Sequence, residues 1–174
     1  SHVIYSYMIS RYVCEKSTFE EIYEFWRDGL WPGRKTDIES VNAIVFNRHI
    51  LETCGNVSIS KDWTIFDWSK PTFFVMKEQE TKKIVGVNSG FKTGDKTYRS
   101  RGIYVLPEYR GNRLSRILLE NTIQQAKEEQ CNLIWSLPRA SAMIAYEGVG
   151  FRRVGRWEDG DMEYGPNYLA IKNL

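Results

Sequence analysis

The stretch VLPEYRGNRLSRILLE, residues 105–120, decides the fold class of this chain, because an apolar run ends in it and a helical pattern begins. The run stops at Pro107, and from Leu114 onward the apolar residues recur at helical spacing. The first amide hydrogens of a helix lack intrahelical partners and attract an anion. Residues 110–115, which are rich in arginine, are therefore a candidate phosphate-binding turn. The alternative is an ordinary surface helix start with solvated arginines.

The segments on either side of this turn have clear periodicity. Three strands separated by short polar turns are expected before it, and they should form an antiparallel meander. After the helix that begins at Leu114, an apolar run predicts a buried strand, and a short helix follows it. The expected elements are strands at 72–78, 83–92, 97–106 and 133–137, and the short helix at about 140–147.

The two ends of the chain complete the pattern. Ser17 and Glu20 have the spacing of a capping box, and apolar residues then predict a helix that stops near residues 29–32. The other expected elements are a first strand at 3–13, a second helix at about 38–54, and last strands at 151–157 and 168–172. Without repeats or linkers, this order predicts one α/β domain, residues 1–174, around a central sheet.

Composition excludes several classes of protein. The net charge of +2 is too small for a nucleic-acid partner, which needs a concentrated basic face. No apolar run reaches the roughly 18 residues of a membrane span, and no secretory leader is recognisable. We therefore expect a cytoplasmic protein without a nucleic-acid or membrane partner. The pattern of His and Cys residues suggests no metal site.

Two motifs together resemble the GNAT superfamily of acyl-coenzyme A dependent N-acyltransferases. The first motif consists of Val105, Pro107, Tyr109, Arg110 and Gly111, and the second of Tyr146, Glu147, Gly150 and Phe151. The predicted element order also matches that family over nearly the whole chain. The resemblance implies the GNAT fold, of the α/β (α+β) class: a mixed sheet of about seven strands with about four flanking helices, splayed between the strands at 97–106 and 133–137.

The resemblance also implies a co-substrate, acetyl-coenzyme A, and the residues that would serve it. Tyr146 is the expected acid that protonates the departing thiolate, and a main-chain amide near Val105 is the expected oxyanion donor. No metal is implied, and the general base stays open between Glu108, Asp67, Glu163 and a water chain. The expected coenzyme-binding residues are Tyr104, Val105, Arg110, Gly111, Asn112, Arg113, Leu114, Ser115 and Arg139.

This chain departs from the family pattern at Arg113, where glycine is usual, and at Ser115, where glycine or alanine is usual. A side chain at position 113 is tolerable only if Arg113 keeps ordinary helical dihedrals and points away from the ligand, and we expect that it does both. Arg113 would then pair with a coenzyme phosphate at the rim. The alternative is that its guanidinium occupies the phosphate site. Arg139, where many relatives carry asparagine, is a further departure.

The implied function is transfer of an acetyl group from acetyl-coenzyme A to a primary amine of a small molecule or protein. The alternative is a non-catalytic GNAT-like module that binds coenzyme A or a protein partner. Acceptor choice is expected from residues 30–37 and 156–168. The second segment holds four acidic residues, which either attract a cationic amine or form a solvated hairpin tip. Whether the protein is a homodimer is left open.

Overall fold

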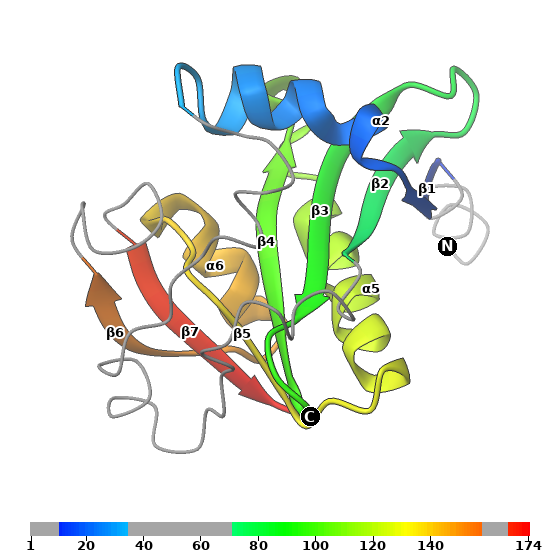
Figure 1. Ribbon diagram of the computed structural model, residues 1–174. Coiled ribbons are helices and arrows are strands. Elements are labelled where there is room, and N and C mark those ends of the chain that lie inside the picture. The colour runs from blue at the N-terminus through cyan, green and yellow to red at the C-terminus, as the bar shows by residue number, and fades with distance from the viewer. Residues whose placement is uncertain (1–10, 35–70, 158–166) are drawn as a thin grey trace, which may run out of the picture.

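The computed structural model describes residues 11–34, 71–157 and 167–174 (Figure 1). Seven strands form one sheet in the order β1-β2-β3-β4-β5-β7-β6. Neighbouring strands are antiparallel except β4 and β5, which are parallel. The strands are β1 (Tyr12–Ser17), β2 (Thr72–Glu78), β3 (Ile84–Lys92), β4 (Thr97–Val105), β5 (Leu133–Ser136), β6 (Arg152–Trp157) and β7 (Asn167–Asn173). This seven-stranded mixed sheet confirms the expected fold.

The described helices lie on both faces of the sheet. They are α2 (Phe19–Glu24), the π-helix η1 (Phe25–Leu30), the 3₁₀ turn η3 (Pro107–Tyr109), α5 (Leu114–Glu128) and α6 (Ala140–Gly148). The meander β2–β4, the helices α5 and α6, and the strand β5 were all predicted to within a residue or two. The helix expected at 38–54 lies outside the described residues.

The start of the chain differs from the prediction. The first strand is β1 at Tyr12–Ser17, not 3–13, and residues 3–10 lie outside the described residues. The capping residue of α2 is Thr18, whose hydroxyl accepts a hydrogen bond from the Glu21 amide at 3.4 Å. Ser17 was expected in that role, but it is still paired in the sheet with Phe73. The capping spacing therefore recurs one residue later, at Thr18 and Glu21.

The hydrophobic core is divided by the sheet. One side, which we call the η1-side core, is built around the fully buried Trp26 of η1. The other side, the α5-side core, packs α5 and α6 against the sheet. The η1-side core contains Ile22, Trp26, Trp31, Phe73, Val75, Val87, Phe91, Leu133, Trp135, Leu137, Leu169 and Ile171. The α5-side core contains Phe74, Met76, Val85, Tyr98, Val105, Leu114, Leu118, Leu119, Ile123, Ala126, Cys131, Ile134, Met143, Tyr146, Phe151 and Ala170.

The two halves of the sheet part between β4 and β5, as the family resemblance implied. Only Thr97, Tyr98 and Arg99 pair with β5, whose partners are Leu133 to Trp135. Beyond Arg99, β4 continues beside β3, while β5 continues beside β7. Figure 1 shows the resulting divergence of the β2–β4 half from the β5–β7 half. In the described part of the chain, this edge of β4 therefore has no partner strand after Arg99.

A β-bulge interrupts β4 at the point of divergence. Ser89 pairs with Arg101 and Val87 pairs with Tyr104, so Gly102 and Ile103 together lie opposite one residue of β3. Gly102 has φ +83°, the left-handed conformation that favours glycine at the first bulge position. The bulge changes which face each side chain occupies. Arg101 and Tyr104 both contact aromatic or apolar residues of the η1-side core, whereas Ile103 packs with the α5-side core.

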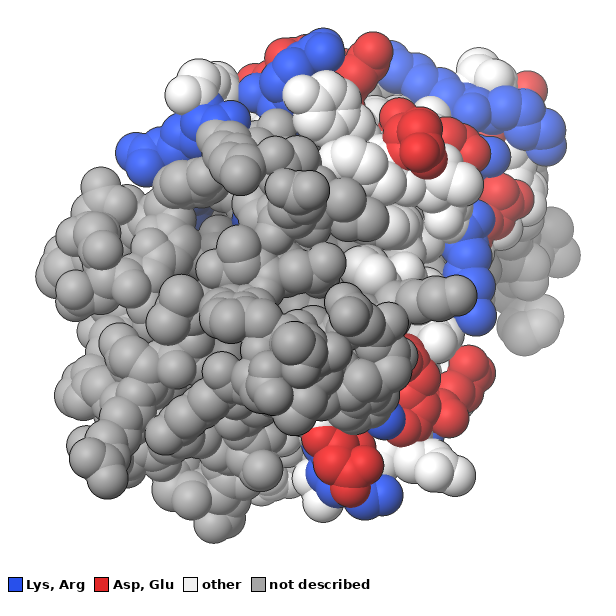
Figure 2. Space-filling model, in the orientation of Figure 1, with Lys and Arg blue, Asp and Glu red and all other residues white. Residues whose placement is uncertain are grey.

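Charges of both signs alternate along the edge formed by α2 and η1 (Figure 2). One such pair is Arg27 and Asp28, whose closest side-chain atoms lie 2.8 Å apart. This arrangement agrees with the mild net charge of +2. None of the described helices is both long enough and apolar enough to span a bilayer.

Candidate active site

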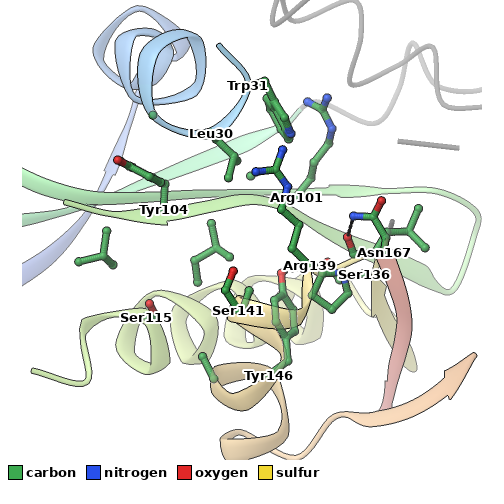
Figure 3. Close-up of a pocket in the computed structure, with 18 of the residues that line it drawn as sticks. Leu30, Trp31, Arg101, Tyr104, Ser115, Ser136, Arg139, Ser141, Tyr146 and Asn167 are labelled. Carbon is green, nitrogen blue, oxygen red and sulfur yellow. Dashed lines mark hydrogen bonds between the residues drawn. The ribbon is translucent and has the colours of Figure 1, made fainter. Parts of the chain in front are cut away.

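A cavity of about 280 Å³ opens where β4 and β5 part. Residues from η1, β4, β5, α5 and α6 line it, so it is bounded by both cores of the protein. Figure 3 shows Leu30 and Trp31 on one side of the strands, and Ser115, Ser141 and Tyr146 on the other. Its lining includes Gly29, Leu30, Trp31, Arg99, Arg101, Gly102, Ile103, Tyr104, Val105, Arg110, Ser115, Ser136, Leu137, Pro138, Arg139, Ser141, Ala142, Ala145, Tyr146 and Asn167.

Tyr146 is aimed into this cavity by the way α6 ends. The Phe151 amide donates to the Tyr146 carbonyl at 3.1 Å, and the Gly150 amide donates to the Glu147 carbonyl at 3.1 Å. These two bonds form a Schellman motif, in which Gly150 takes the left-handed conformation at φ +99°. The Phe151 ring then meets the Tyr146 ring edge to face, with centroids 4.9 Å apart. The second sequence motif therefore has a local structural role in fixing this tyrosine.

The Tyr146 hydroxyl is buried and held by two serines. The side chain is 1% exposed, and its oxygen lies 2.8 Å from Ser100 Oγ and 2.9 Å from Ser136 Oγ. Ser136 Oγ also donates to the Ser100 carbonyl at 2.6 Å, and Asn88 donates to Ser100 Oγ at 3.0 Å. Burial raises the pKa of Tyr146, and the two serine hydroxyls and the charge of Arg99 oppose that rise in part. The phenol therefore keeps its proton at neutral pH.

The turn at 110–115 combines two residues in the left-handed conformation, Gly111 at φ +86° and Arg113 at φ +61°. The expectation that Arg113 keeps ordinary helical dihedrals is therefore wrong. The backbone of Arg113 adopts a conformation that suits glycine. For any other residue this conformation costs roughly 1–2 kcal/mol of stability. The Arg113 side chain is exposed, and the residue is not among those that line the cavity.

The start of α5 has the features of an anion site. Arg113 is the capping residue and makes no capping hydrogen bond through its side chain, and the first turn contains no acidic residue. Amide hydrogens of this turn therefore lack partners within the helix. Nearby, Arg110 Nε donates to the Val105 carbonyl at 2.9 Å, and its guanidinium lies 5.4 Å from the centre of the Tyr104 ring.

The structure brings most of the predicted site residues to one place. The predicted residues that line the cavity are Tyr104, Val105, Arg110, Ser115, Arg139 and Tyr146. Of the remaining four, Gly111, Asn112 and Arg113 form the exposed turn beside it, and Leu114 is buried in the α5-side core. The Asn112 side chain donates to the Tyr109 carbonyl at 2.9 Å and so braces the turn. The Leu114 side chain therefore packs in the core.

The candidates for the base and for an acidic acceptor site lie either outside the described residues or away from the cavity. Asp67, Glu163 and the acidic segment 158–163 lie outside the described residues. Glu108 is exposed and does not line the cavity. In the parts of the chain that the structure describes, no three His, Cys, Asp or Glu side chains gather as a metal site would require.

Four polar residues of this region were missed by the sequence reasoning. Arg99, Ser100 and Arg101 are buried within β4, and Ser136 is buried at the end of β5. A signal was present, because the segment TYRSRG places two arginines inside a run that otherwise reads as a central strand. Buried charges are rare unless they are paired or functional, so such a run is a reason to expect a site.

Replacing Arg113 with glycine should stabilise the protein and preserve coenzyme binding. Glycine adopts φ +61° without the penalty of a Cβ atom, so we expect the free energy of unfolding to rise by roughly 1 kcal/mol. Urea denaturation measures this change, and Arg116→Gly, at a position inside α5, is the control that should lose stability instead. If Arg113→Gly created coenzyme binding that the original protein lacks, the Arg113 side chain would be shown to block the phosphate site.

Comparisons with known proteins agree with this architecture. The family model described as "Acetyltransferase (GNAT) family" matches residues 44–151. An acetyltransferase of the GNAT family from Staphylococcus aureus Mu50 has a TM-score of 0.58 at 16% identity, over 94% of this chain and 99% of its own. Ard1 from Thermoplasma volcanium has a TM-score of 0.62 at 13% identity, over 94% and 98%. The NatC complex bound to Gag peptide and CoA has a TM-score of 0.56 at 14% identity, over 94% of this chain and 99% of its own. No curated protein matched the sequence.

Proposed function

Because the chain belongs to the GNAT acetyltransferase family, we propose that it transfers the acetyl group of acetyl-coenzyme A to a primary amine of a small molecule or protein. One observation carries the proposal. The cavity at the β4–β5 divergence holds a buried tyrosine hydroxyl at one wall and reaches Arg110 and Ser115 beside the start of α5. An acyl thioester with a long phosphate-bearing arm needs both features in one continuous site.

The described residues fit this co-substrate. Its pyrophosphate would accept hydrogen bonds from the free amides that begin α5, with Ser115 at the same turn. Beyond Arg99, the edge of β4 that has no partner strand among the described residues would offer main-chain amides to an extended amide-containing arm. Acetyl-coenzyme A supplies the acetyl group as a thioester, and one structural neighbour is named as a CoA-bound complex.

The protein's own contribution would be to position the reactants and to handle protons. As the C–N bond forms and the C–S bond breaks, the departing sulfur needs a proton. Tyr146 is the proposed donor, because burial keeps its phenol protonated and its side chain lines the cavity. Ser100 and Ser136 would hold its oxygen in place. A main-chain amide near Val105 remains the proposed oxyanion donor.

Calorimetric titration with acetyl-coenzyme A, followed by assay of coenzyme A release with added amines, tests the proposal. We expect saturable binding and amine-dependent release. Ser115→Asp is a useful variant, because an acidic residue in the first turn suits the helix dipole yet repels a phosphate. It should weaken binding by about 10-fold or more while the fold is kept, whereas Ser115→Ala should bind nearly normally. A folded protein that binds no acetyl-coenzyme A would contradict the proposal.

A further inference from the structure

Two buried arginines form part of the cavity wall on the η1 side of the sheet. Arg99 is 2% exposed and Arg101 is 3% exposed, and both line the cavity. Both alternate along β4 with Ser100, which contacts Tyr146, so they point to the opposite face of the sheet. Figure 3 shows Arg101 together with Trp31, on the opposite side of the strands from Tyr146 and Ser115.

Aromatic rings hold the two guanidinium groups in place. The Arg101 guanidinium lies 4.3 Å from the centre of the Trp31 ring and 5.2 Å from that of Trp26. The Arg99 guanidinium lies 4.9 Å from the centre of the Trp135 ring. Contact with a ring restrains a guanidinium, whose N–H groups form a planar fork. This is the geometry that recognises a planar anion through two parallel hydrogen bonds.

Donors for such an anion remain at this wall. Both arginines make other interactions. A guanidinium has five N–H donors, however, and Nε and Nη1 of Arg99 and Nη1 of Arg101 are buried atoms without a hydrogen-bond partner. Among the cavity-lining residues that the structure describes, four are arginines and none is Asp or Glu.

The position of Arg99 and Arg101 separates them from the start of α5. The start of α5, where the phosphates would bind, belongs to the α5 side of the sheet, and Ser100 between the two arginines faces Tyr146 there. Arg110 lies after the bulge, beside Tyr104. Arg99 and Arg101 therefore lie at the part of the cavity wall that the second substrate would contact.

We propose that the acceptor amine carries a carboxylate, and that Arg101, assisted by Arg99, binds this carboxylate and so orients the amine. This inference rests on the proposed function and narrows its substrate class to amino acids and related amino carboxylates. A preference for amino carboxylates is the opposite of the preference for cationic amines that the acidic segment 158–163 would favour.

Matched acceptors test the inference on the unmodified protein. Glycine, leucine, glutamate, β-alanine and γ-aminobutyrate are each compared with their amides and with the corresponding decarboxylated amines. An α-amino amide has a less basic nitrogen than its acid, so chemistry alone favours the amide at neutral pH. We nevertheless expect kcat/KM to be about 10-fold or more higher for at least one carboxylate, because a charged hydrogen bond contributes that much.

Variants of Arg101 then identify the recognising group. Arg101→Gln should raise KM for the carboxylate by about 10- to 100-fold with little change for its amide, and Arg101→Lys should retain part of the preference. Arg152→Gln removes an exposed arginine of β6 and is the charge-matched control. The affinity for the preferred carboxylate, measured by calorimetry with coenzyme A present, should fall from the unmodified protein to Arg101→Lys and further to Arg101→Gln. Thermal unfolding shows whether each variant is folded.

The outcomes separate this inference from the proposed function. A carboxylate preference that Arg101→Gln removes would support the inference. Equal use of acids and amides, or a preference for diamines, would overturn it and leave the acetyltransferase proposal intact. If coenzyme A is bound but none of these amines, acid or neutral, is acetylated, the inference is overturned as well. If acetyl-coenzyme A is not bound, the proposed function itself fails.

Discussion

Tyr146→Phe is expected to lower kcat by about 100-fold or more, the usual contribution of a positioned general acid, while the affinity for acetyl-coenzyme A changes little. The substitution removes one oxygen from a residue that is 1% exposed and lines the cavity. The ring and its edge-to-face contact with Phe151 remain, so the end of α6 should be preserved. Steady-state kinetics at saturating substrates and calorimetric titration measure the two quantities separately.

The fold should survive this change. Ser136 Oγ keeps its 2.6 Å bond to the Ser100 carbonyl, and Asn88 keeps its bond to Ser100 Oγ, so the loss of stability should be about 1 kcal/mol. Tyr109→Phe is a matched control, because its hydroxyl donates to Glu78 at 2.9 Å and the residue does not line the cavity. It should keep normal turnover. An unchanged kcat in Tyr146→Phe would remove the role proposed for this phenol.

The pH profile gives an independent test of Tyr146. Burial raises its pKa above the ordinary value of 10.0, so the phenol keeps its proton, and its ability to donate it, to a higher pH than an exposed tyrosine. If Tyr146 is the acid, loss of kcat at alkaline pH should begin only above about pH 10, and Tyr146→Phe should lack this alkaline decline. A decline that persists in the variant would belong to another group.

Gly102→Ala is expected to cost about 2–5 kcal/mol of stability, the sum of a left-handed backbone penalty and overpacking of the core. Gly102 has φ +83°, and an added Cβ would lie 2.4 Å from atoms of the Trp26 ring. Trp26 is fully buried and donates through Nε1 to the Gly102 carbonyl at 2.8 Å, so neither group can move without loss. Urea denaturation gives the change in free energy of unfolding.

Gly111→Ala is the matched control for this prediction. Gly111 has a similar φ of +86°, but an added Cβ there would meet nothing within 4 Å. Its cost should be limited to the backbone term of about 1–2 kcal/mol. The difference between the two variants then measures the contact between Gly102 and Trp26. Equal losses would mean that this contact contributes nothing, and that only the backbone conformation matters.

Much of the fold could be predicted because it depends on local patterns. The meander β2–β4 has apolar runs separated by short turns, and α5 and α6 have clear periodicity next to recognisable motifs. The capping residue of α2 was missed by one position, because Ser17 and Thr18 are adjacent and pairing with β2, which decides between them, is not local. The conformation of Arg113 was missed for a related reason: residue type alone argued against φ +61°.

The site was predicted only in part, because its two sides depend on different information. Tyr146, Arg110 and Ser115 belong to motifs that can be read along the chain. Arg99 and Arg101 do not, because their burial depends on rings that are distant in the sequence. Trp26 of η1 and Trp31 just after it contact Arg101, and Trp135 of β5 contacts Arg99. Only the assembled fold brings those rings onto the arginines.

The bulge at Gly102 divides β4 into two parts whose side chains alternate between the faces of the sheet in a different register. This division matters for redesigning the protein. Upstream of it, the odd-numbered positions 99 and 101 face the cavity on the η1 side, whereas downstream Val105 packs against α5. Substitutions at 99 and 101 should thus change the wall proposed for the acceptor without disturbing the helix that would bind the coenzyme. A deletion of one residue here would exchange the faces of everything on one side of it. Length changes in this strand should therefore be far less tolerated than residue exchanges.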